Sequence, residues 1–336
     1  MTQKKSISRI AVIGGGSWAT ALVKIFSENN LQLNWWLKNE QDVEHIIKYR
    51  RNPSYLSNIE INTSIVSPSI DIIGAVKDAE AVILVTPAAF IKEVLERIPE
   101  EYLQNKIIVT AIKGMIPQIH FLVTDYLERE FSIEKKNLCV IGGPCHSEEV
   151  AMEKQSYLTV GGINEFISEE IATLLRCRFV KASVITDPDG IEYCAVMKNI
   201  IAIASGIARG LNYGDNFQAV LVSNAMHEIE RFLDKVSPRK ERDLHASAYL
   251  GDLLVTCYSQ FSRNRTLGNM VGRGYSVKAA QVEMNMIAEG YYAVYSINEL
   301  NKKLGIEMPV TKAVYNILYE KISPSVELKI LENIMK

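Results

Sequence analysis

The sequence predicts an α/β domain built on a parallel sheet, followed by a second domain that is mostly helical. In the first half, short β-rich apolar runs alternate with longer amphipathic segments, which is typical of βαβ units. From about residue 187 the apolar residues recur with a helical period instead. The length of 336 residues also suits two domains of about 150 residues each. We expect a boundary between 1–186 and 187–336.

Seven runs in the first half predict strands, and the first five are nearly continuous in apolar residues, as expected when helices cover both faces of a sheet. The predicted strands are 7–13, 31–36, 81–85, 107–111, 138–141, 155–161 and 179–185. Amphipathic patterns predict helices at 90–98, 118–131 and near 165–175. In the second half, helical periodicity covers 191–209, 217–232 and 277–283. The turn-forming cluster at 187–190 marks the expected boundary and a helix start.

Composition and charge exclude several classes of protein. The chain is 48% hydrophobic and 23% charged, which is ordinary for a globular protein and excludes general disorder. A net charge of -2 provides no field to attract nucleic acid or anionic lipid. The longest stretch without Asp, Glu, Lys or Arg is 10–23, too short to span a bilayer. Its apolar run at 10–13 is shorter than the core of a secretion signal, so we expect a cytoplasmic protein.

The cysteines and histidines argue against a disulfide framework or a metal site. Five cysteines include no C-x-x-C pair, and the five histidines are scattered without the spacing of metal ligands. We therefore expect reduced thiols that are mostly in the core, and no bound metal.

A glycine-rich loop carries the clearest chemical signal. The run Gly14-Gly-Gly16-Ser-Trp-Ala19 directly follows the first predicted strand and opens a helical pattern. Gly14 permits a tight turn, Gly16 lets backbone approach a pyrophosphate, and Ala19 allows close packing of the helix on the strand. The helix N-terminus adds positive potential. The loop predicts a dinucleotide site, the alternative being a merely flexible turn.

The residue that would select the dinucleotide is ambiguous. Sites that prefer NAD usually place an acidic residue about 20 positions further on, at the end of the second strand. Here that strand ends at Lys38 and Asn39, and Glu40 comes two positions late. Lys38 could bind the 2′-phosphate of NADP, so NADP stays open beside NAD. Alternatively, Lys38 is a solvated lysine at a strand end.

Two further loops follow predicted strands, where open α/β sheets bind their ligands. Lys113 and Gly114 come after the strand at 107–111, and a lysine there can meet an anion. The loop Gly142-Gly-Pro-Cys-His146 could turn backbone donors toward a ligand. Its simpler interpretation is a β-to-α turn.

Three candidates lie in the helical half. Lys198, beside Asn199, sits inside an apolar run, and a buried lysine is costly unless it is used or paired. Burial lowers its pKa and suits it to exchange a proton, whereas a lysine with a packed stem and solvated head is the alternative. The cluster Ser262-Arg263-Asn264-Arg265 offers a phosphate clamp, or equally a helix start capped by Ser262. Asp252 follows a glycine in Gly251-Asp-Leu253.

Taken in order, these segments resemble the NAD(P)-dependent glycerol-3-phosphate dehydrogenase family in its bacterial form, over nearly the whole chain. Further segments that carry the resemblance are Asn52-Pro-Ser-Tyr-Leu56, Val85-Thr-Pro87, Glu149-Val-Ala151, Gly214-Asp-Asn216 and Glu289-Gly290. The resemblance implies a Rossmann-type doubly wound parallel sheet, then an all-α substrate domain, in a protein that is usually a homodimer. It implies reduction of dihydroxyacetone phosphate to sn-glycerol 3-phosphate by NADH or NADPH, for glycerophospholipid synthesis.

The resemblance also assigns roles by position. Lys198 matches the catalytic lysine. The positions that match substrate-binding residues are Lys113, Gly143, Cys145, Lys198, Asp252, Ser262, Arg263 and Asn264. With the glycine loop, the positions expected to bind the nucleotide are Gly14, Gly16, Ser17, Trp18, Lys38, Lys113, Ser147, Arg263, Ile287 and Glu289.

This chain departs from the family pattern at several places. Cys145 replaces a Ser or Thr, His146 replaces an aromatic residue, and Ser147 replaces an alanine. Gln218 and Asn224 stand where a lysine and an arginine are common. Two rival functions are a dinucleotide-binding sensor that has lost turnover, and a dehydrogenase acting on another short hydroxy acid or alcohol. The second rival would not need the phosphate clamp.

Overall fold

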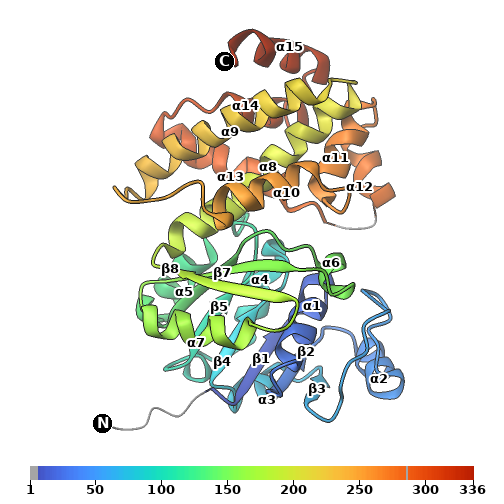
Figure 1. The fold of residues 1–336 in the computed structure, drawn as a ribbon, viewed down its shortest axis with the longest axis vertical. Coiled ribbons are helices and arrows are strands. Elements are labelled where there is room, and N and C mark those ends of the chain that lie inside the picture. Colours follow the sequence, from blue (N-terminus) through green and yellow to red (C-terminus); the bar gives the residue numbers. More distant parts are fainter. Residues whose placement is uncertain (1–6, 285–286) are drawn as a thin grey trace. The chain divides into compact units, whose positions relative to one another are not determined.

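The computed structural model describes residues 7–284 and 287–336, which form two compact units (Figure 1). Unit 1 contains the chain as far as Thr86, then Phe90–Ile112 and Val123–Pro188. Unit 2 contains Pro87–Ala89, Lys113–Leu122 and Asp189–Lys336. Two short segments from the first half of the chain therefore cluster with the helices of the second half.

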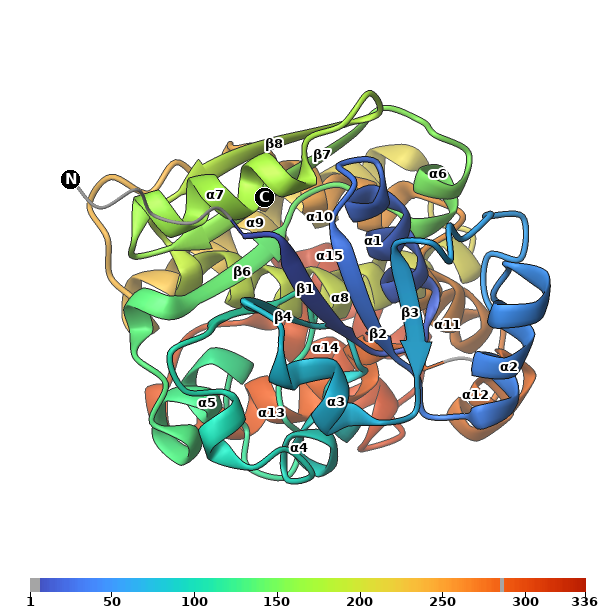
Figure 2. The ribbon, with the colours of Figure 1, turned by 90° about the horizontal axis from the view of Figure 1, so that it is seen from below.

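Unit 1 is built on one eight-stranded sheet in the order β3-β2-β1-β4-β5-β6-β7-β8 (Figure 2). The strands are β1 (Arg9–Ile13), β2 (Gln32–Trp36), β3 (Val66–Ser69), β4 (Ala81–Leu84), β5 (Ile107–Thr110), β6 (Leu138–Gly142), β7 (Ser156–Gly162) and β8 (Val180–Ile185). Strands β1 to β6 are parallel to one another, and β8 is parallel to β7. The predicted doubly wound sheet is confirmed, with every predicted strand present.

Two features of the sheet differ from the prediction. The strand β3 was not predicted because Pro68 interrupts it; it lies at the sheet edge, where a missing N–H is tolerated. The pair β6 and β7 is antiparallel, whereas a uniformly parallel sheet was expected. The connection between them holds only the five-residue helix α6 (Ser147–Ala151).

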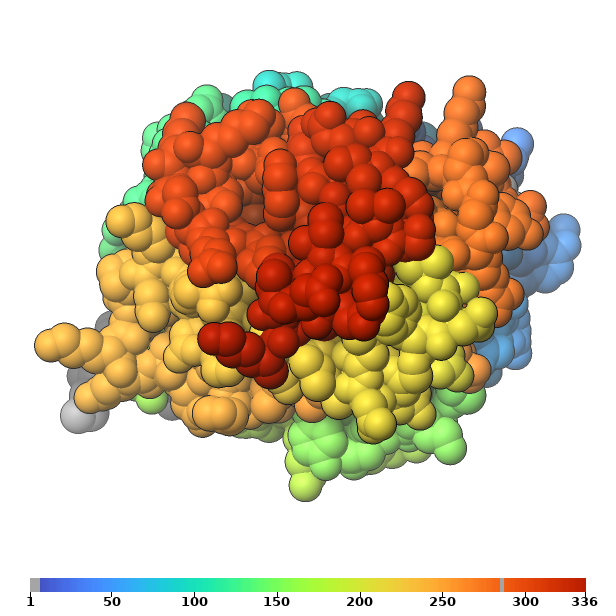
Figure 3. All heavy atoms as spheres, turned by 90° about the horizontal axis from the view of Figure 1, so that it is seen from above, coloured from blue at the N-terminus to red at the C-terminus, as the bar shows by residue number. Residues whose placement is uncertain are grey.

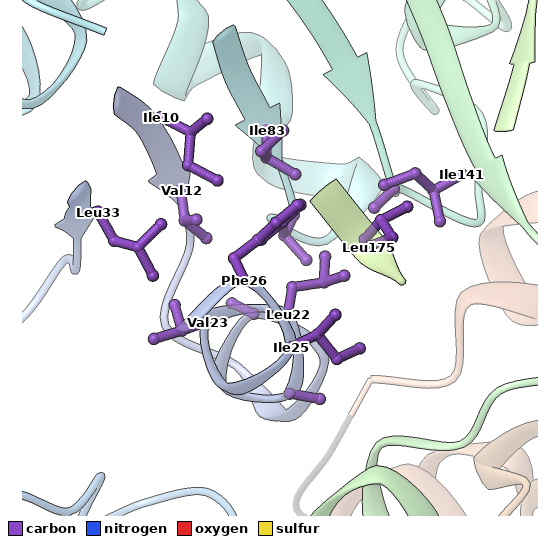
Figure 4. Packing of buried hydrophobic residues seen from close by; sticks show 14 of the residues in the cluster. Ile10, Val12, Leu22, Val23, Ile25, Phe26, Leu33, Ile83, Ile141 and Leu175 are labelled. Carbon is purple, nitrogen blue, oxygen red and sulfur yellow. The ribbon is translucent and has the colours of Figure 1, made fainter. Parts of the chain in front are cut away.

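Helices cover the sheet of unit 1, and α1 supplies much of its core. The longer helices of this part of the chain are α1 (Ser17–Ser27), α2 (Glu40–Tyr49), α3 (Ile72–Lys77), α4 (Ala88–Leu95), α5 (Val123–Phe131) and α7 (Glu165–Leu175), with short turns η1 (Glu100–Tyr102) and η2 (Lys135–Asn137). Leu22 and Phe26 of α1 join Val12, Ile83 and Ile141 of the sheet in one buried cluster (Figure 4). This packing fixes the start of α1 at the end of β1.

The predicted helix at 118–131 is wrong over its first five residues. Residues 116 to 121 instead form a turn closed by a bridge between Ile116 and Phe121, and His120 has a φ of 57°. That left-handed conformation cannot continue a right-handed helix. The helix α5 begins only at Val123, and the turn belongs to unit 2.

The described elements of the second half of the chain are all helices, as predicted. Its elements are α8 (Pro188–Gly210), α9 (Asp215–Val236), the π-helical turn η3 (Ser247–Gly251), α10 (Asp252–Tyr258), α11 (Arg263–Gly272), α12 (Val277–Met284), α13 (Glu289–Leu304), α14 (Pro309–Leu318) and α15 (Pro324–Ile334). Figure 3 shows α15, in dark red, at the surface of unit 2. Asn224 of α9 donates to the carbonyl oxygen of Lys336, just after α15. Among the described helices, α8 alone is long and apolar enough to cross a membrane, and 94% of its apolar window is buried.

Candidate active site

The glycine loop of unit 1 has the geometry of a phosphate-binding turn. Gly14 has a φ of +139°, and a Cβ there would lie 2.9 Å from the carbonyl oxygen of Val85, so only glycine fits. Gly16 precedes the first residue of α1 as its N-cap. A Cβ on Gly16 would meet no atom within 4 Å. The loop thus leaves open space beside a helix N-terminus, which fits a pyrophosphate.

Lys38 follows the end of β2 by two residues and is exposed. Its Nζ is 6.0 Å from the ring centroid of Phe90, and that ring is 46% exposed. A cation beside an exposed aromatic face can accept a phosphate and a flat base. The pair therefore fits the adenosine end of a dinucleotide.

The loop after β6 contains three predicted site residues. Gly143 has a φ of +106°, and a Cβ there would lie 2.8 Å from the carbonyl oxygen of Tyr157. The side chain of Cys145 is buried in the apolar core of unit 1. Ser147, the first residue of α6, is buried and donates to Glu148 Oε2 at 3.1 Å. Contact of Cys145 with a substrate stays a prediction.

In unit 2, Lys198 lies at the centre of a buried polar cluster. Its side chain is on α8 and the residue is only 4% exposed. The Nζ atom donates to Asp252 Oδ1 and, at 3.1 Å, to Thr256 Oγ1. The Nζ of Lys113 is 3.9 Å from Asp252 Oδ2. The carboxylate of Asp252 therefore lies between two lysine ammonium groups.

The electrostatics of this cluster suit proton exchange. Burial lowers the pKa of Lys198 from 10.5 to about 8; the carboxylate of Asp252 opposes the shift, and the charge of Lys113 adds to it. A lysine with this pKa exists in both protonation states near neutral pH, which is what a general acid and base requires. The buried polar lysine predicted from sequence is thus paired with Asp252 and held in the interior.

Two residues that hold this cluster were not among the predicted site residues. Thr256 Oγ1 accepts from Lys198 and donates to the carbonyl oxygen of Asp252 at 2.6 Å. Asn199 Nδ2 donates to the carbonyl oxygen of Lys113 at 2.7 Å, which holds the Lys113 segment. Thr256 follows Asp252 by four residues, a spacing that places both on one face of a helix. In the sequence, that spacing was the signal from which Thr256 could have been predicted as a neighbour of Asp252.

Glu289 of unit 2 is half-buried, and its carboxyl group lies in the interior. Its Oε1 accepts from the backbone N–H of Ala88 at 3.1 Å, and its Oε2 is buried without a hydrogen bond from the described residues. Burial raises its pKa to about 7, against the opposing effects of the Ala88 N–H and of Arg263. A Cβ on Gly114 would lie 2.7 Å from Oε2. The carboxyl group is therefore packed against the backbone of Ala88 and against Gly114, where a larger residue would not fit.

The residues of the predicted phosphate clamp lie at the start of α11, and whether they contact a phosphate stays a prediction. Ser262 Oγ accepts from the N–H of Arg265 at 3.3 Å and caps the helix. Asn264 Oδ1 is buried and accepts from the N–H of Gly290 at 2.9 Å. Arg263 is partly exposed. Its positive charge opposes the rise in the pKa of Glu289 that burial causes. The cluster thus contains two half-buried arginines, Arg263 and Arg265, whose guanidinium groups are of the kind that suits a phosphate.

The predicted site residues divide between the two units. Unit 1 contains Gly14, Gly16, Ser17, Trp18, Lys38, Gly143, Cys145 and Ser147. Unit 2 contains Lys113, Lys198, Asp252, Ser262, Arg263, Asn264, Ile287 and Glu289. Within unit 2, the structure brings Lys198, Asp252 and Lys113 together. Ile287 is half-buried in the segment before α13.

The two family departures in α9 have internal partners. Gln218 is buried, accepts from Ser205 Oγ at 2.8 Å and donates to the carbonyl oxygen of Ser205 at 2.9 Å. Asn224 Nδ2 donates to the carbonyl oxygen of Lys336 at 3.0 Å. Both side chains are thus engaged in packing within unit 2.

Comparison with known proteins agrees with this geometry. Residues 9–166 match the model of the NAD-dependent glycerol-3-phosphate dehydrogenase N-terminus, and residues 187–329 match the model of its C-terminus. The chain is 32% identical over 326 residues to glycerol-3-phosphate dehydrogenase (NAD(P)+) of Staphylococcus carnosus, covering 97% of this chain and 98% of the relative. It is 34% identical over 325 residues to the same enzyme of Shouchella clausii, covering 95% and 94%.

A solved structure extends the comparison to three dimensions. The crystal structure of glycerol-3-phosphate dehydrogenase from Coxiella burnetii superposes with a TM-score of 0.90 at 28% identity, and covers 97% of this chain and 98% of its own. The matches extend over both units and almost the full length of each relative. The chain therefore belongs to the NAD-dependent glycerol-3-phosphate dehydrogenase family.

Proposed function

We propose that this protein reduces dihydroxyacetone phosphate to sn-glycerol 3-phosphate with NADH or NADPH, reversibly, and thereby supplies glycerophospholipid synthesis. Family membership supports the reaction. The observation that carries the proposal is Lys198, buried in an apolar helix with a pKa of about 8 and bonded to Asp252. A buried lysine of this kind has no structural need that an apolar residue would not meet better.

The residues of unit 2 account for the proton transfer. When bound, the nicotinamide cofactor supplies or accepts the hydride. As the substrate carbonyl becomes an alkoxide, the ammonium group of Lys198 stabilises the charge and then donates its proton to the oxygen. Asp252 and Thr256 hold Nζ in place for that transfer. In the oxidative direction the neutral amine of Lys198 accepts the proton from the substrate hydroxyl.

The remaining site residues are assigned to binding. Arg263 holds the phosphate of the substrate, which fixes the three-carbon chain by its unreactive end. The polar positions Lys113, Gly143, Cys145, Asp252, Ser262 and Asn264 complete the proposed substrate contacts. The cofactor is held by the glycine loop at Gly14, Gly16, Ser17 and Trp18, together with Lys113, Ser147, Arg263, Ile287 and Glu289. Lys38 accepts the 2′-phosphate when the cofactor is NADPH.

We also propose that the enzyme is a homodimer in the cytoplasm. The family resemblance supports the dimer. The small net charge of -2 and the burial of α8 within unit 2 support the location, since neither feature favours attachment to a membrane.

Replacing Arg263 by alanine tests the substrate assignment. We expect the KM for dihydroxyacetone phosphate to rise about a hundredfold, because removing one partner of a charge-assisted contact costs 2 to 5 kcal/mol. Consumption of NADH and of NADPH is followed by absorbance, with unphosphorylated dihydroxyacetone as a second substrate. The wild type should prefer the phosphorylated substrate strongly, and Arg263→Ala should lose that preference.

The matched control is Arg273→Ala, which removes an exposed arginine at the other end of α11. It should leave the KM unchanged. A wild type that binds NADPH but turns over neither substrate would favour the sensor, and equal use of both substrates would favour another dehydrogenase.

The pKa of Lys198 predicts the pH dependence of the reaction. Reduction needs the protonated lysine, and the pKa of about 8 means that this form is lost as the pH rises through 8. We expect kcat/KM for reduction to be level below about pH 7.5 and to fall roughly tenfold per pH unit well above 8. Oxidation of sn-glycerol 3-phosphate should show the opposite trend and level off above 8. A reductive profile that is flat to pH 9.5 would contradict Lys198 as the proton donor.

A further inference from the structure

Asn52 belongs to the segment 52–56, to which the proposed function gives no role. The residue is 1% exposed. Its Nδ2 donates to the carbonyl oxygen of Gly15 at 3.1 Å and to Thr20 Oγ1 at 2.9 Å. Its Oδ1 accepts from the N–H of Ser54 at 3.0 Å and from that of Tyr55 at 3.1 Å. The side-chain amide thus makes four hydrogen bonds, both donors and both acceptor sites being used.

The carbonyl groups on either side of Gly15 are held in the same way. Thr20 Oγ1 donates to the carbonyl oxygen of Gly16 at 3.0 Å. Trp35 Nε1, fully buried, donates to the carbonyl oxygen of Gly14 at 2.7 Å. Three successive carbonyl groups of the glycine loop therefore each accept a hydrogen bond from a buried side chain.

This arrangement determines which side of the loop is offered to a ligand. In a trans peptide the N–H points opposite to the C=O of the same unit. Because the side chains hold the carbonyl oxygens on the protein side, the N–H of the following residue is directed away from them. The open space at Gly16 and the N-terminus of α1 belong to this same loop.

We propose that Asn52 is a positioning residue for the pyrophosphate of the dinucleotide. By fixing the Gly15 carbonyl and Thr20 together, it holds the glycine loop with its N–H groups toward the phosphates before the cofactor arrives. The proposal rests on the proposed function only in taking the ligand to be NADH or NADPH. An amide is needed because the same rigid group must donate to the Gly15 carbonyl and accept from the N–H groups of residues 54 and 55. A carboxylate could not donate, and it would place a negative charge next to the glycine loop.

The isosteric change Asn52→Asp tests this role. A carboxylate retains the acceptor for Ser54 and Tyr55 but turns a second acceptor toward the Gly15 carbonyl. We expect the Kd for NADPH, measured by fluorescence titration, to rise at least about tenfold, since a hydrogen bond is replaced by repulsion. At saturating NADPH, kcat and the KM for dihydroxyacetone phosphate should stay within about twofold, because the buried lysine site in unit 2 is untouched.

A second variant separates geometry from charge. Thr20→Val adds no charge and removes the hydroxyl that joins Asn52 to the Gly16 carbonyl. The N–H of Thr20 still donates to that carbonyl at 2.9 Å, so we expect a smaller increase in Kd, about threefold. The control is Asn62→Asp: Asn62 is exposed and accepts from the N–H of Ser64 at 3.1 Å in a similar turn. This control should leave the Kd unchanged.

Fragments of the cofactor show whether the effect is local to the pyrophosphate. ADP-ribose contains the pyrophosphate, and its affinity should weaken in Asn52→Asp as much as that of NADPH. Adenosine 2′-monophosphate lacks it and should bind the variant within about twofold of its wild-type affinity. Thermal unfolding without ligand establishes that each variant is folded.

Two results would overturn the proposal: a folded Asn52→Asp with an unchanged Kd for NADPH, or equal losses for ADP-ribose and adenosine 2′-monophosphate. If Asn52→Asp fails to fold, the role of Asn52 is decided with Thr20→Val, by comparing its affinities for NADPH and ADP-ribose with its affinity for adenosine 2′-monophosphate. The proposed function fails differently. A wild type that binds NADPH yet never reduces dihydroxyacetone phosphate would refute the reaction, while the affinities of the variants would still decide the role of Asn52.

Discussion

Replacing Lys198 by methionine is expected to lower kcat for the reduction of dihydroxyacetone phosphate by about a thousandfold or more. Methionine fills the volume of the lysine stem, so the apolar surroundings of α8 are preserved. It cannot stabilise the developing alkoxide or donate a proton, and those two contributions together are worth at least this factor. The measurement is steady-state turnover with saturating NADPH, supported by single-turnover oxidation of bound NADPH.

Two comparisons make this prediction specific. The Kd for NADPH should be nearly unchanged in Lys198→Met, since Lys198 is not among the residues assigned to the cofactor. Lys198→Arg keeps a positive charge beside Asp252 but holds its proton far more tightly. It should recover part of the alkoxide stabilisation and little of the proton transfer. If Lys198→Met kept more than a tenth of the wild-type kcat, another group would have to be the acid.

The second large effect is expected at Gly268, where substitution by alanine should lower the free energy of unfolding by about 3 kcal/mol. A Cβ on Gly268 of α11 would lie 2.1 Å from the carbonyl oxygen of Ile203 on α8, and one on Gly206 would lie 2.1 Å from the carbonyl oxygen of Arg265. Both obstacles are backbone atoms, which cannot rotate aside. The two helices would have to separate, and guanidinium unfolding followed by circular dichroism measures the cost.

Gly214 provides the matched control for this substitution. It precedes α9 with a φ of -79°, and a Cβ there would meet no atom within 4 Å. Gly214→Ala should change stability by less than about 1 kcal/mol, chiefly through the weaker capping of alanine. Equal losses at the two positions would show that chain flexibility, and not contact between helices, governs the effect. Gly268→Ala should also reduce kcat, because Lys198 lies on the helix that must move.

Most of the fold could be predicted because its signals are local. A continuous apolar run between turn residues predicts a buried strand wherever it occurs, and every such run in unit 1 became one. The edge strand β3 escaped prediction because Pro68 is tolerated only through its place in the sheet. The apolar pattern of β7 predicts a strand but not its antiparallel direction. The start of α5 depends on one residue, His120, in a left-handed conformation.

The candidate site also contains residues that could be predicted from local sequence and residues whose surroundings depend on the fold. Lys198 could be found because a charge inside an apolar helix is a local anomaly. The acid Glu289 carried no local signal, and only the family resemblance pointed to it. Its burial comes from Ala88 and Gly114, far away along the chain. Ser262 shows the converse: its residue type suits both a helix cap and a phosphate contact, and only the fold shows that it caps α11.

The assignment of Lys113–Leu122 to the helical unit constrains how this enzyme can be divided. The chain changes unit after Thr86, Ala89, Ile112, Leu122 and Pro188, which makes five crossings. A fragment that begins at 189 would therefore lack the lysine that neighbours Asp252 and the backbone carbonyl that Asn199 binds. If two relatives exchanged their C-terminal halves, the chimera would take Lys113 from one parent and Lys198 and Asp252 from the other. Recombination at residue 188 is thus expected to yield chimeras whose defects lie in catalysis more than in solubility.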